Sequence, residues 1–213
     1  MPDFSFENSA RDRGFDVIVG VDEAGRGPWA GPVVAGAVVL DPATLDPALR
    51  DGLDDSKTLG AAKRAVLFDL LSNTSTIGVG IASVAEIDAV NILQATFLAM
   101  TRAVADLRAN RGLSPDCVLV DGTKAPDFGC AAEAIKKGDG QSLSIAAASI
   151  VAKVSRDRIM GNLALDFPGY GWERNAGYGT AEHKEAIARL GVTAHHRRSF
   201  KPIQAALGAG RGG

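Results

Sequence analysis

Four carboxylates stand at or just beyond the ends of short apolar segments, at Asp22, Glu23, Asp121 and Asp139. Acidic residues are poor strand formers and are costly to bury without a partner. Because neighbouring strands of a sheet end close together, carboxylates at several strand ends can form one cluster. Such a cluster repels itself unless a cation neutralises it, and hard oxygen ligands select Mg²⁺ or Mn²⁺ rather than zinc. The pattern predicts a divalent-metal site; for each carboxylate alone, the alternative is a solvated strand end.

Asp22 and Glu23 are adjacent, which sets a geometric condition on any ion that they share. Successive strand residues point to opposite faces, so both side chains cannot reach one ion from a regular strand. The AGRG segment that follows (24–27) contains two glycines, which give the backbone the freedom to turn. We therefore expect the strand to break or twist at Glu23.

The glycine-rich segment has a second interpretation, because Gly25, Gly27 and Ala30 match the spacing of a dinucleotide-binding loop. That loop must open a helix, whose N-terminus binds the phosphates. Here Pro28 and Pro32 interrupt the segment, and a strand-like run follows, so we reject a dinucleotide site. Backbone amides in a Gly-Arg-Gly loop can still point at a phosphate or a sugar hydroxyl. The GxSxG, HExxH and Walker A patterns are absent from the sequence.

The elements that must position these residues follow from hydrophobic periodicity. Valine- and isoleucine-rich or short apolar runs predict strands at 15–22, 32–40, 76–84, 116–122 and 131–136. Apolar residues spaced three to four apart predict helices at 57–71, 85–111, 142–165 and 181–190. We expect one mixed α/β domain over 1–213, with a polar leader (1–14), a helical C-terminal portion (about 166–207) and a disordered tail (208–213).

The composition is that of an ordinary globular protein: 213 residues, 46% hydrophobic and 23% charged, which excludes wholesale disorder. The two cysteines, Cys117 and Cys130, have no zinc-like or CxxC spacing and suit a reducing compartment. The longest apolar stretch, 143–152, is far shorter than the roughly 20 residues that span a bilayer. These features predict a cytoplasmic protein with no membrane segment.

The formal net charge of −2 conceals an asymmetry along the chain. Residues 1–60 hold 5 basic and 11 acidic groups, whereas residues 136–213 hold 12 basic and 6 acidic groups. One physical use of this asymmetry is a set of metal-binding carboxylates beside a phosphate-binding surface. The alternative is a chance division of charge over solvated faces.

Seven motifs occur together in this sequence: VDEAGRGPWAGPVVAGAVVL, DDSKTL, NILQAT, VDGTK, KGDGQSLSIAAASIVAKVSRDRIM, GYGT and HHRRSF. Together they resemble bacterial ribonuclease HII in content and in order, from about Val17 to Leu207. The related ribonuclease HIII shares much of this core but carries a long N-terminal extension and lacks the tyrosine of GYGT. Because 21 residues precede Asp22 and Tyr178 is present, the resemblance favours ribonuclease HII.

The resemblance implies a ribonuclease H-like α/β fold, a mixed sheet flanked by helices, and hydrolysis of the RNA strand of RNA–DNA hybrids. It further implies incision on the 5′ side of a single ribonucleotide in duplex DNA, leaving 3′-hydroxyl and 5′-phosphate ends. By position, Asp22, Glu23 and Asp121 resemble the family's metal ligands, and Asp139 its fourth active-site carboxylate. Two Mn²⁺ or Mg²⁺ ions roughly 3.5–4 Å apart would then hold the attacking and leaving oxygens, and no histidine or lysine base is required.

The resemblance also implies how the substrate is recognised. The loop Gly25, Arg26 and Gly27 would hydrogen-bond the ribose 2′-hydroxyl, and Tyr178 would pack against the sugar. Phosphate contacts, which position a duplex without reading its sequence, would come from Ser56, Lys57, Lys153, His183 and Arg198. For each of these five, a solvated surface position is the alternative, and the run 195–198 could instead tie the C-terminal part to the core. Asp157, four residues after Lys153 on a helix, is interpreted as an ion-pair or surface residue.

The sequence departs from the family's usual pattern at Trp29, at Thr123 and at Asn175-Ala176, which bears on substrate affinity rather than on the class of activity. Two alternatives remain: a ribonuclease HIII-like hybrid nuclease, and a non-catalytic nucleic-acid-binding module whose carboxylates are structural. The expected partners are an RNA–DNA hybrid and ribonucleotide-containing duplex DNA, with replication or repair proteins possible. We expect a monomer.

Overall fold

The structure, a computed structural model, describes residues 1–54 and 59–209, with only the backbone at 110–111. Its centre is a five-stranded mixed sheet in the order β3-β2-β1-β4-β5. β1 pairs with β2 and β2 with β3 in antiparallel fashion, whereas β1–β4 and β4–β5 are parallel. The strands are β1 (Ile18–Ala24), β2 (Val33–Val39), β3 (Thr76–Ala82), β4 (Cys117–Asp121) and β5 (Ala131–Ile135).

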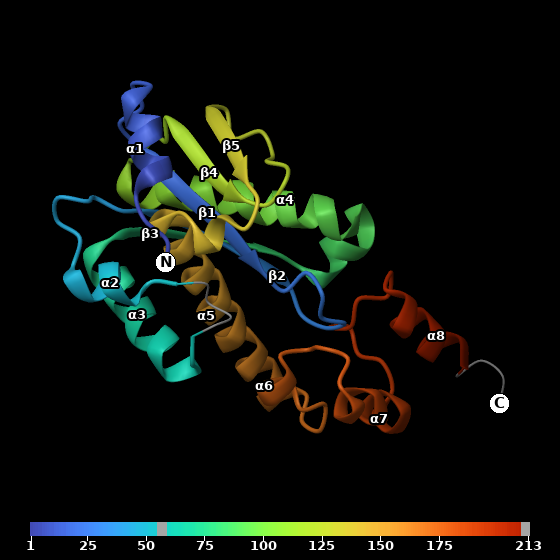
Figure 1. Ribbon diagram of the computed structural model, residues 1–213. Helices are drawn as coiled ribbons and strands as arrows, with labels where there is room; N and C mark the ends of the chain where they lie inside the picture. Colours follow the sequence, from blue (N-terminus) through green and yellow to red (C-terminus); the bar gives the residue numbers. More distant parts are fainter. Residues whose placement is uncertain (55–58, 210–213) are drawn as a thin grey trace.

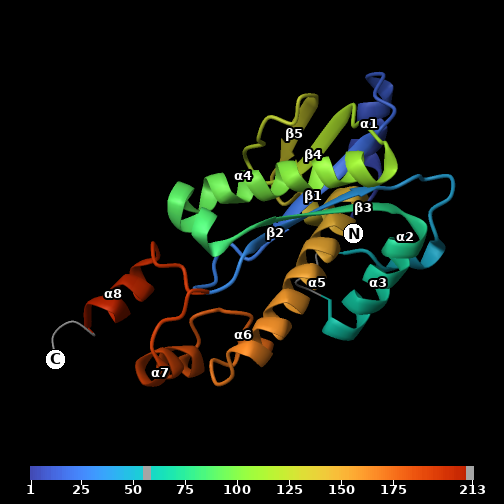
Figure 2. The same ribbon diagram turned by 180° about the vertical axis from the view of Figure 1, so that it is seen from behind.

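Helices cover both faces of this sheet (Figures 1 and 2). α4 (Val84–Arg111) packs on one face, where Val19 and Val21 of β1 join its apolar side chains in one core cluster. α5 (Leu143–Asp166) and α3 (Ala61–Thr74) pack on the other face, where Val38 points. Because strand side chains alternate between faces, β2 supplies both cores, with Ala37 on the α4 side and Val38 on the α5 side.

Two glycines allow α5 to lie directly on the sheet. A Cβ atom at Gly20 of β1 would lie 2.1 Å from the carbonyl carbon of Ser144, and one at Gly36 of β2 would lie 2.4 Å from the carbonyl oxygen of Ala148. Both neighbours are backbone atoms of α5, so any larger residue would have to push the helix away.

The N-terminal helix α1 (Ser5–Asp12) holds the start of α5 in place. Its Glu7 is buried, and Glu7 Oε1 accepts hydrogen bonds from Ser142 Oγ (2.6 Å), Ser144 N (2.9 Å) and Ser144 Oγ (2.5 Å). A carboxylate at a helix N-terminus satisfies amide groups that have no partner within the helix. The segment predicted as a polar leader is therefore an ordered part of the fold.

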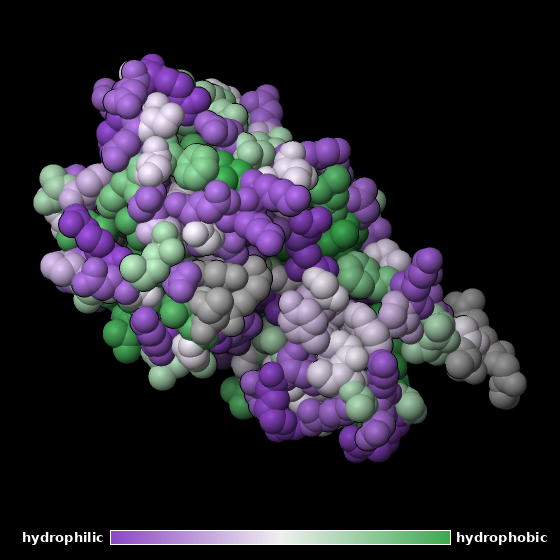
Figure 3. All heavy atoms as spheres, in the orientation of Figure 1, coloured by the Kyte–Doolittle hydropathy of each residue, from purple (hydrophilic) through white to green (hydrophobic). Residues whose placement is uncertain are grey.

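The C-terminal portion lies beyond the end of α5, away from the sheet (Figure 1). It consists of α6 (Trp172–Asn175), α7 (Ala181–Leu190) and α8 (Lys201–Ala209), packed around the buried Trp172 and Ile203. A bridge between Ala30 and His196 ties it to the β1–β2 connection. In Figure 3, hydrophilic side chains predominate over the middle of the face shown.

The α/β class and the five strands agree with the sequence-based predictions, but several boundaries do not. β1 does not break at Glu23, because Glu23 and Ala24 continue to pair with Ala35 and Val34 of β2. The helix predicted at 57–71 is α3, and the short α2 (Pro47–Gly52) was not foreseen. The prediction of a disordered tail is wrong at 208–209, because these residues belong to α8; residues 210–213 lie outside the described residues. None of the helices in the described ranges is long and apolar enough to cross a membrane.

Candidate active site

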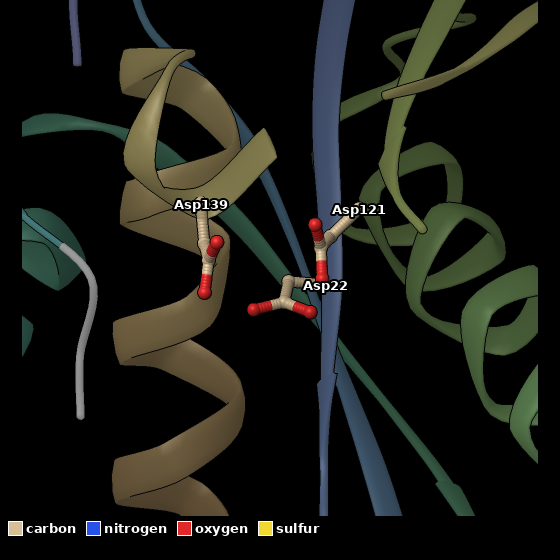
Figure 4. Close-up of side chains that lie close together, drawn as sticks. All are labelled: Asp22, Asp121 and Asp139. Atoms are coloured by element: carbon tan, nitrogen blue, oxygen red, sulfur yellow. The ribbon is translucent and has the colours of Figure 1, made fainter. Parts of the chain in front are cut away.

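Three of the four predicted carboxylates form one cluster. Asp22 of β1, Asp121 at the end of β4 and Asp139 each offer an oxygen within 4.8 Å of the others (Figure 4). The parallel register pairs Val21 with Val120, one residue before each of the first two aspartates. Asp22 and Asp121 therefore project from adjacent strands on the same face of the sheet, toward Asp139.

Asp139 reaches the cluster from the short helix η1 (Gly138–Gly140), which connects β5 to α5. The N–H of Gly138 donates to Asp121 Oδ1 over 2.7 Å, so one carboxylate of the cluster fixes the segment that carries another. Lys137, just before η1, has a left-handed backbone (φ 58°), which turns the chain sharply at this point. The position of Asp139 thus depends on a turn and on the packing of α5.

The electrostatics of the cluster favour a bound cation. Burial raises the pKa of Asp22 well above its ordinary value, and the negative charges of Glu23 and Asp121 raise it further, against hydrogen bonds from the Glu23 amide and the Ser149 hydroxyl. Bringing like charges together in a buried place is unfavourable without a counter-ion. Carboxylate oxygens are hard ligands, and this donor set fits Mg²⁺ or Mn²⁺.

Glu23 lies beside the cluster rather than in it. Since β1 is unbroken, strand alternation directs the Glu23 side chain away from that of Asp22. Glu23 nevertheless lines the same cavity as Asp22, at the end of the strand. Its Oε1 accepts a hydrogen bond from Arg26 Nη1 over 3.2 Å, and the side chain is only 12% exposed. Of the four carboxylates predicted to cluster, Asp22, Asp121 and Asp139 do so, whereas Glu23 lies in the wall of the cavity beside them.

A cavity of about 470 Å³ opens over the cluster. Besides Asp22, Glu23 and Asp121, its walls contain Ala24, Gly25, Arg26, Gly27, Arg64, Ser149, Lys153, Arg156 and Tyr178. The sequence analysis did not single out Arg64, Ser149 or Arg156. Arg64 faces the cavity from α3, and its helical position alone did not distinguish it from a solvated arginine.

The glycine loop (residues 25–27) and Tyr178 form one side of this cavity. Gly25 has φ +97°, a conformation that side chains disfavour, and a Cβ atom there would lie 2.0 Å from Arg156 Nε. A Cβ atom at Gly27 would be 3.3 Å from Cε1 of Tyr178, whose residue is 50% exposed. The structure therefore brings together the loop and the tyrosine that the sequence analysis assigned to ribose recognition.

Comparison with known proteins gives the same family that the sequence motifs resemble. The family model described as "Ribonuclease HII" matches residues 19–203. The chain belongs to the ribonuclease HII family. Two proteins named Ribonuclease HII are similar to it: one from Ruegeria pomeroyi (56% identity over 207 residues, 97% of this chain and 85% of that protein) and one from Rhodospirillum rubrum (58% over 209 residues, 97% and 92%).

A solved structure has the same fold. The crystal structure of ribonuclease H2 from Pyrococcus horikoshii OT3 aligns with a TM-score of 0.74 and 28% identity, covering 93% of this chain and 100% of that one. The mixed sheet with flanking helices is accordingly the ribonuclease H-like fold. Together with its family membership, this makes the chain a ribonuclease H-type hydrolase.

Of the five residues predicted to contact phosphate in this ribonuclease HII family member, only Lys153 lines the cavity within the described part of the chain. Lys153 Nζ pairs with Asp157 Oδ1 over 2.7 Å, which confirms the ion pair expected for Asp157. Arg198 is exposed but lies outside the cavity lining; its backbone N–H donates to Asp88. Ser56 and Lys57 lie outside the described residues.

The prediction that His183 contacts phosphate is wrong, because the ring is fully buried. His183 Nδ1 donates to the carbonyl oxygen of Tyr178 (2.9 Å), and Nε2 accepts from Trp172 Nε1 (3.1 Å). His196 Nδ1 accepts from Thr193 N, so His196 Nε2 carries the proton and donates to His183 Nε2 over 3.1 Å. Both rings are neutral in this network, which holds the backbone of Tyr178.

Two of the departures from the family pattern also support the Tyr178 segment. Asn175 Nδ2 donates to the Tyr170 carbonyl, and Asn175 Oδ1 accepts from Gly177 N. Trp29 packs against Gly179, where a Cβ atom would lie 2.2 Å from Trp29 Cζ2. Thr123 lines a smaller cavity of about 80 Å³ that shares Glu23 and Asp121 with the main one. None of these departures disturbs the carboxylate cluster.

The histidine network should make stability depend on pH. Burial above all, together with the neighbouring rings of His183 and His195, lowers the pKa of His196 from the ordinary 6.5 to about 4. Between about pH 4 and pH 6.5, His196 binds a proton in the unfolded chain but not in the native protein. The free energy of unfolding therefore falls as the pH falls below 6.5. We expect the free energy of unfolding to be about 2 kcal/mol lower at pH 5 than at pH 7 from His196 alone.

Urea unfolding at the two pH values measures this difference, and His196→Gln is the matched variant. It removes the titrating ring while leaving the carboxylate cluster untouched. The variant should lose most of the change between pH 7 and pH 5. An equal change in both proteins would show that other groups are responsible.

Proposed function

We propose that this protein hydrolyses the RNA strand of RNA–DNA hybrids and also incises duplex DNA on the 5′ side of a single embedded ribonucleotide. The products carry 3′-hydroxyl and 5′-phosphate ends. The observation that carries the proposal is the cluster of Asp22, Asp121 and Asp139, within 4.8 Å of one another beneath a cavity walled by the glycine loop and Tyr178. Membership of the ribonuclease HII family supports it.

The carboxylates would hold divalent metal, Mn²⁺ or Mg²⁺, with Glu23 contributing from the adjoining wall. When bound, a pair of such ions stabilises the attacking and leaving oxygens of a phosphodiester. The protein's own part is to fix the aspartates on two strands and one turn. Asp121 also retains its hydrogen bond from Gly138 N, which keeps the β4 end and η1 together.

Recognition of RNA against DNA requires contact with the ribose 2′-hydroxyl. Arg26 and Gly27 are exposed residues of the cavity wall, and their peptide N–H groups are suited to donate to it. Tyr178 supplies a flat ring beside the loop, against which the sugar at the RNA–DNA junction packs. Lys153 of α5 and Arg64 of α3 also line the cavity and would contact the phosphates. We further propose that the protein acts as a cytoplasmic monomer in replication or repair.

A labelled RNA–DNA hybrid tests this function directly. Hydrolysis should require added Mg²⁺ or Mn²⁺ and should stop with a chelator. A hybrid that stays intact with both metals, but is bound by the protein, would instead support a nucleic-acid-binding module. Hydrolysis of the hybrid together with an intact single-ribonucleotide duplex would indicate the ribonuclease HIII-like alternative.

Tyr178→Ala should reduce incision at a single ribonucleotide by about 10–100-fold, because stacking of one base or sugar on an aromatic ring is worth about 1–3 kcal/mol. Tyr178→Phe keeps the ring and is expected to retain most of the activity. Initial rates on the single-ribonucleotide duplex measure both variants. Equal rates for the wild type and Tyr178→Ala would remove this residue from substrate recognition.

A further inference from the structure

Two buried guanidinium groups lie behind the glycine loop. Arg156 of α5 is 1% exposed and Arg197, in the segment between α7 and α8, is 0% exposed. Burial lowers the pKa of Arg156 to about 10 and that of Arg197 to about 9, with the charge of Arg156 adding to the effect on Arg197. Burying two cations side by side is costly, so their hydrogen-bond partners must compensate.

All the hydrogen bonds found for these two guanidiniums within the described residues go to backbone carbonyls. Arg197 donates to the carbonyl oxygens of Gly25 (2.5 Å), Arg26 (2.9 Å), Gly31 (2.9 Å) and Pro32 (3.1 Å). Arg156 donates to those of Ala30 (3.1 Å), Pro32 (3.0 Å) and Ala176 (2.9 Å). Only Arg197 therefore reaches the two carbonyls inside the glycine loop.

Because the peptide bond is planar, the direction of a carbonyl also fixes the direction of the next N–H group. In a trans peptide the C=O and the following N–H point in opposite directions. The loop has no cis bonds, so fixing the carbonyls of Gly25 and Arg26 on the buried Arg197 directs the N–H groups of Arg26 and Gly27 the other way. Those residues are exposed and line the main cavity, whereas Arg197 is fully buried.

We propose that Arg197 is a positioning residue for recognition of the ribose 2′-hydroxyl, because its guanidinium holds the Gly25 and Arg26 carbonyls inward and so presents two peptide N–H groups to the cavity. The proposal rests on the proposed function, in which those N–H groups meet the 2′-hydroxyl. Arginine suits this task because its two Nη atoms reach different carbonyls at once in a fixed plane. A lysine at this position would keep the charge but not the planar fork.

The test compares binding of two duplexes that are identical except for one 2′-hydroxyl. Asp121→Asn serves as the non-cleaving background, and Kd is measured for a duplex with one ribonucleotide and for its all-DNA counterpart. Adding Arg197→Lys should lower the preference for the ribonucleotide duplex about tenfold, as expected for weakening two hydrogen bonds. The affinity for the all-DNA duplex should stay unchanged, because the Arg197 side chain is fully buried and cannot itself contact a bound duplex.

Ile203→Val, made in the same background, is the control for a merely structural effect. Ile203 is buried in the core cluster of the C-terminal portion, and the change removes one methyl group without altering any loop hydrogen bond. This control should keep the full preference for the ribonucleotide duplex. A folded Arg197→Lys variant that keeps the preference, or that loses affinity for both duplexes equally, would overturn the proposal. A background protein with no preference would refute the proposed 2′-hydroxyl recognition, and the role of Arg197 with it.

Should Arg197→Lys fail to fold, nitrogen-detected NMR of the intact protein decides the matter. A guanidinium held by four carbonyls should give resolved, slowly exchanging Nη protons. These should shift when the ribonucleotide duplex binds and stay in place with the all-DNA duplex. Exchange-averaged Nη signals would show that Arg197 does not fix the loop.

Discussion

Asp121→Asn is expected to reduce hydrolysis of an RNA–DNA hybrid on the order of 10³-fold, through loss of a charged ligand beside the reacting phosphate. Substrate binding should remain close to that of the wild type, since the change leaves the glycine loop, Tyr178 and Lys153 in place. Single-turnover rates and equilibrium binding, measured on the same hybrid, separate the two effects.

The fold should tolerate this substitution for a physical reason. Asn keeps an oxygen that can accept the Gly138 N–H, and it removes one of the negative charges that raise the pKa of Asp22. The metal-free variant should therefore be at least as stable as the wild type. Asp69→Asn is the matched control, because Asp69 is 66% exposed on α3 and lies outside the cavity lining. Turnover by Asp121→Asn at the rate of this control would exclude Asp121 from catalysis.

Gly20→Ala is expected to lower the free energy of unfolding by about 3 kcal/mol, at the upper end of the usual cost of overpacking. The new Cβ atom would lie 2.1 Å from the Ser144 carbonyl carbon, a backbone atom that cannot rotate away. α5 would have to move off β1, and with it the η1–α5 junction that carries Asp139. Activity should therefore fall even in the fraction that remains folded. Urea unfolding and hybrid hydrolysis measure the two effects.

Gly161→Ala provides the control on the same helix. Among the described residues, no atom beyond the adjoining backbone of α5 lies within 4 Å of a Cβ placed at Gly161, and the backbone there is helical. Replacing a helical glycine by alanine stabilises by about 0.5–1 kcal/mol, so this variant should be slightly more stable and fully active. Equal stability of Gly20→Ala and Gly161→Ala would contradict the close packing of α5 on β1.

The sequence allowed the strands and the carboxylate cluster to be predicted because both leave local marks. Apolar runs that end in Asp22 and Asp121 indicate buried strands with acidic ends, and the parallel neighbours β1 and β4 then place the two aspartates together. Of the break or twist expected at Glu23, the break does not occur, for a reason that lies outside the local sequence. Pairing of Glu23 with Ala35 of β2 keeps the strand regular, and glycines permit a turn without imposing one.

Roles that depend on tertiary contacts could not be predicted from local patterns. Arg197 belongs to a residue type that is usually exposed, yet it is buried and donates to the carbonyl of Gly25, far away in the sequence. His183 is also fully buried, and its ring binds the carbonyl of Tyr178 and the ring of His196. Glu7 occurs in a polar segment, and its burial depends on Ser142 and Ser144 at the start of α5. Arg64 reaches the cavity only because α3 packs beside α5.

The central claim is that the carboxylate cluster and the glycine loop act together at a ribonucleotide. The most direct measurement uses duplex DNA with one ribonucleotide, labelled at its 5′ end, with and without Mg²⁺ or Mn²⁺. We predict one metal-dependent cut on the 5′ side of the ribonucleotide, with a 3′-hydroxyl end and no cut in the all-DNA duplex. An intact strand with both metals, or equal cutting of the two duplexes, would contradict the claim.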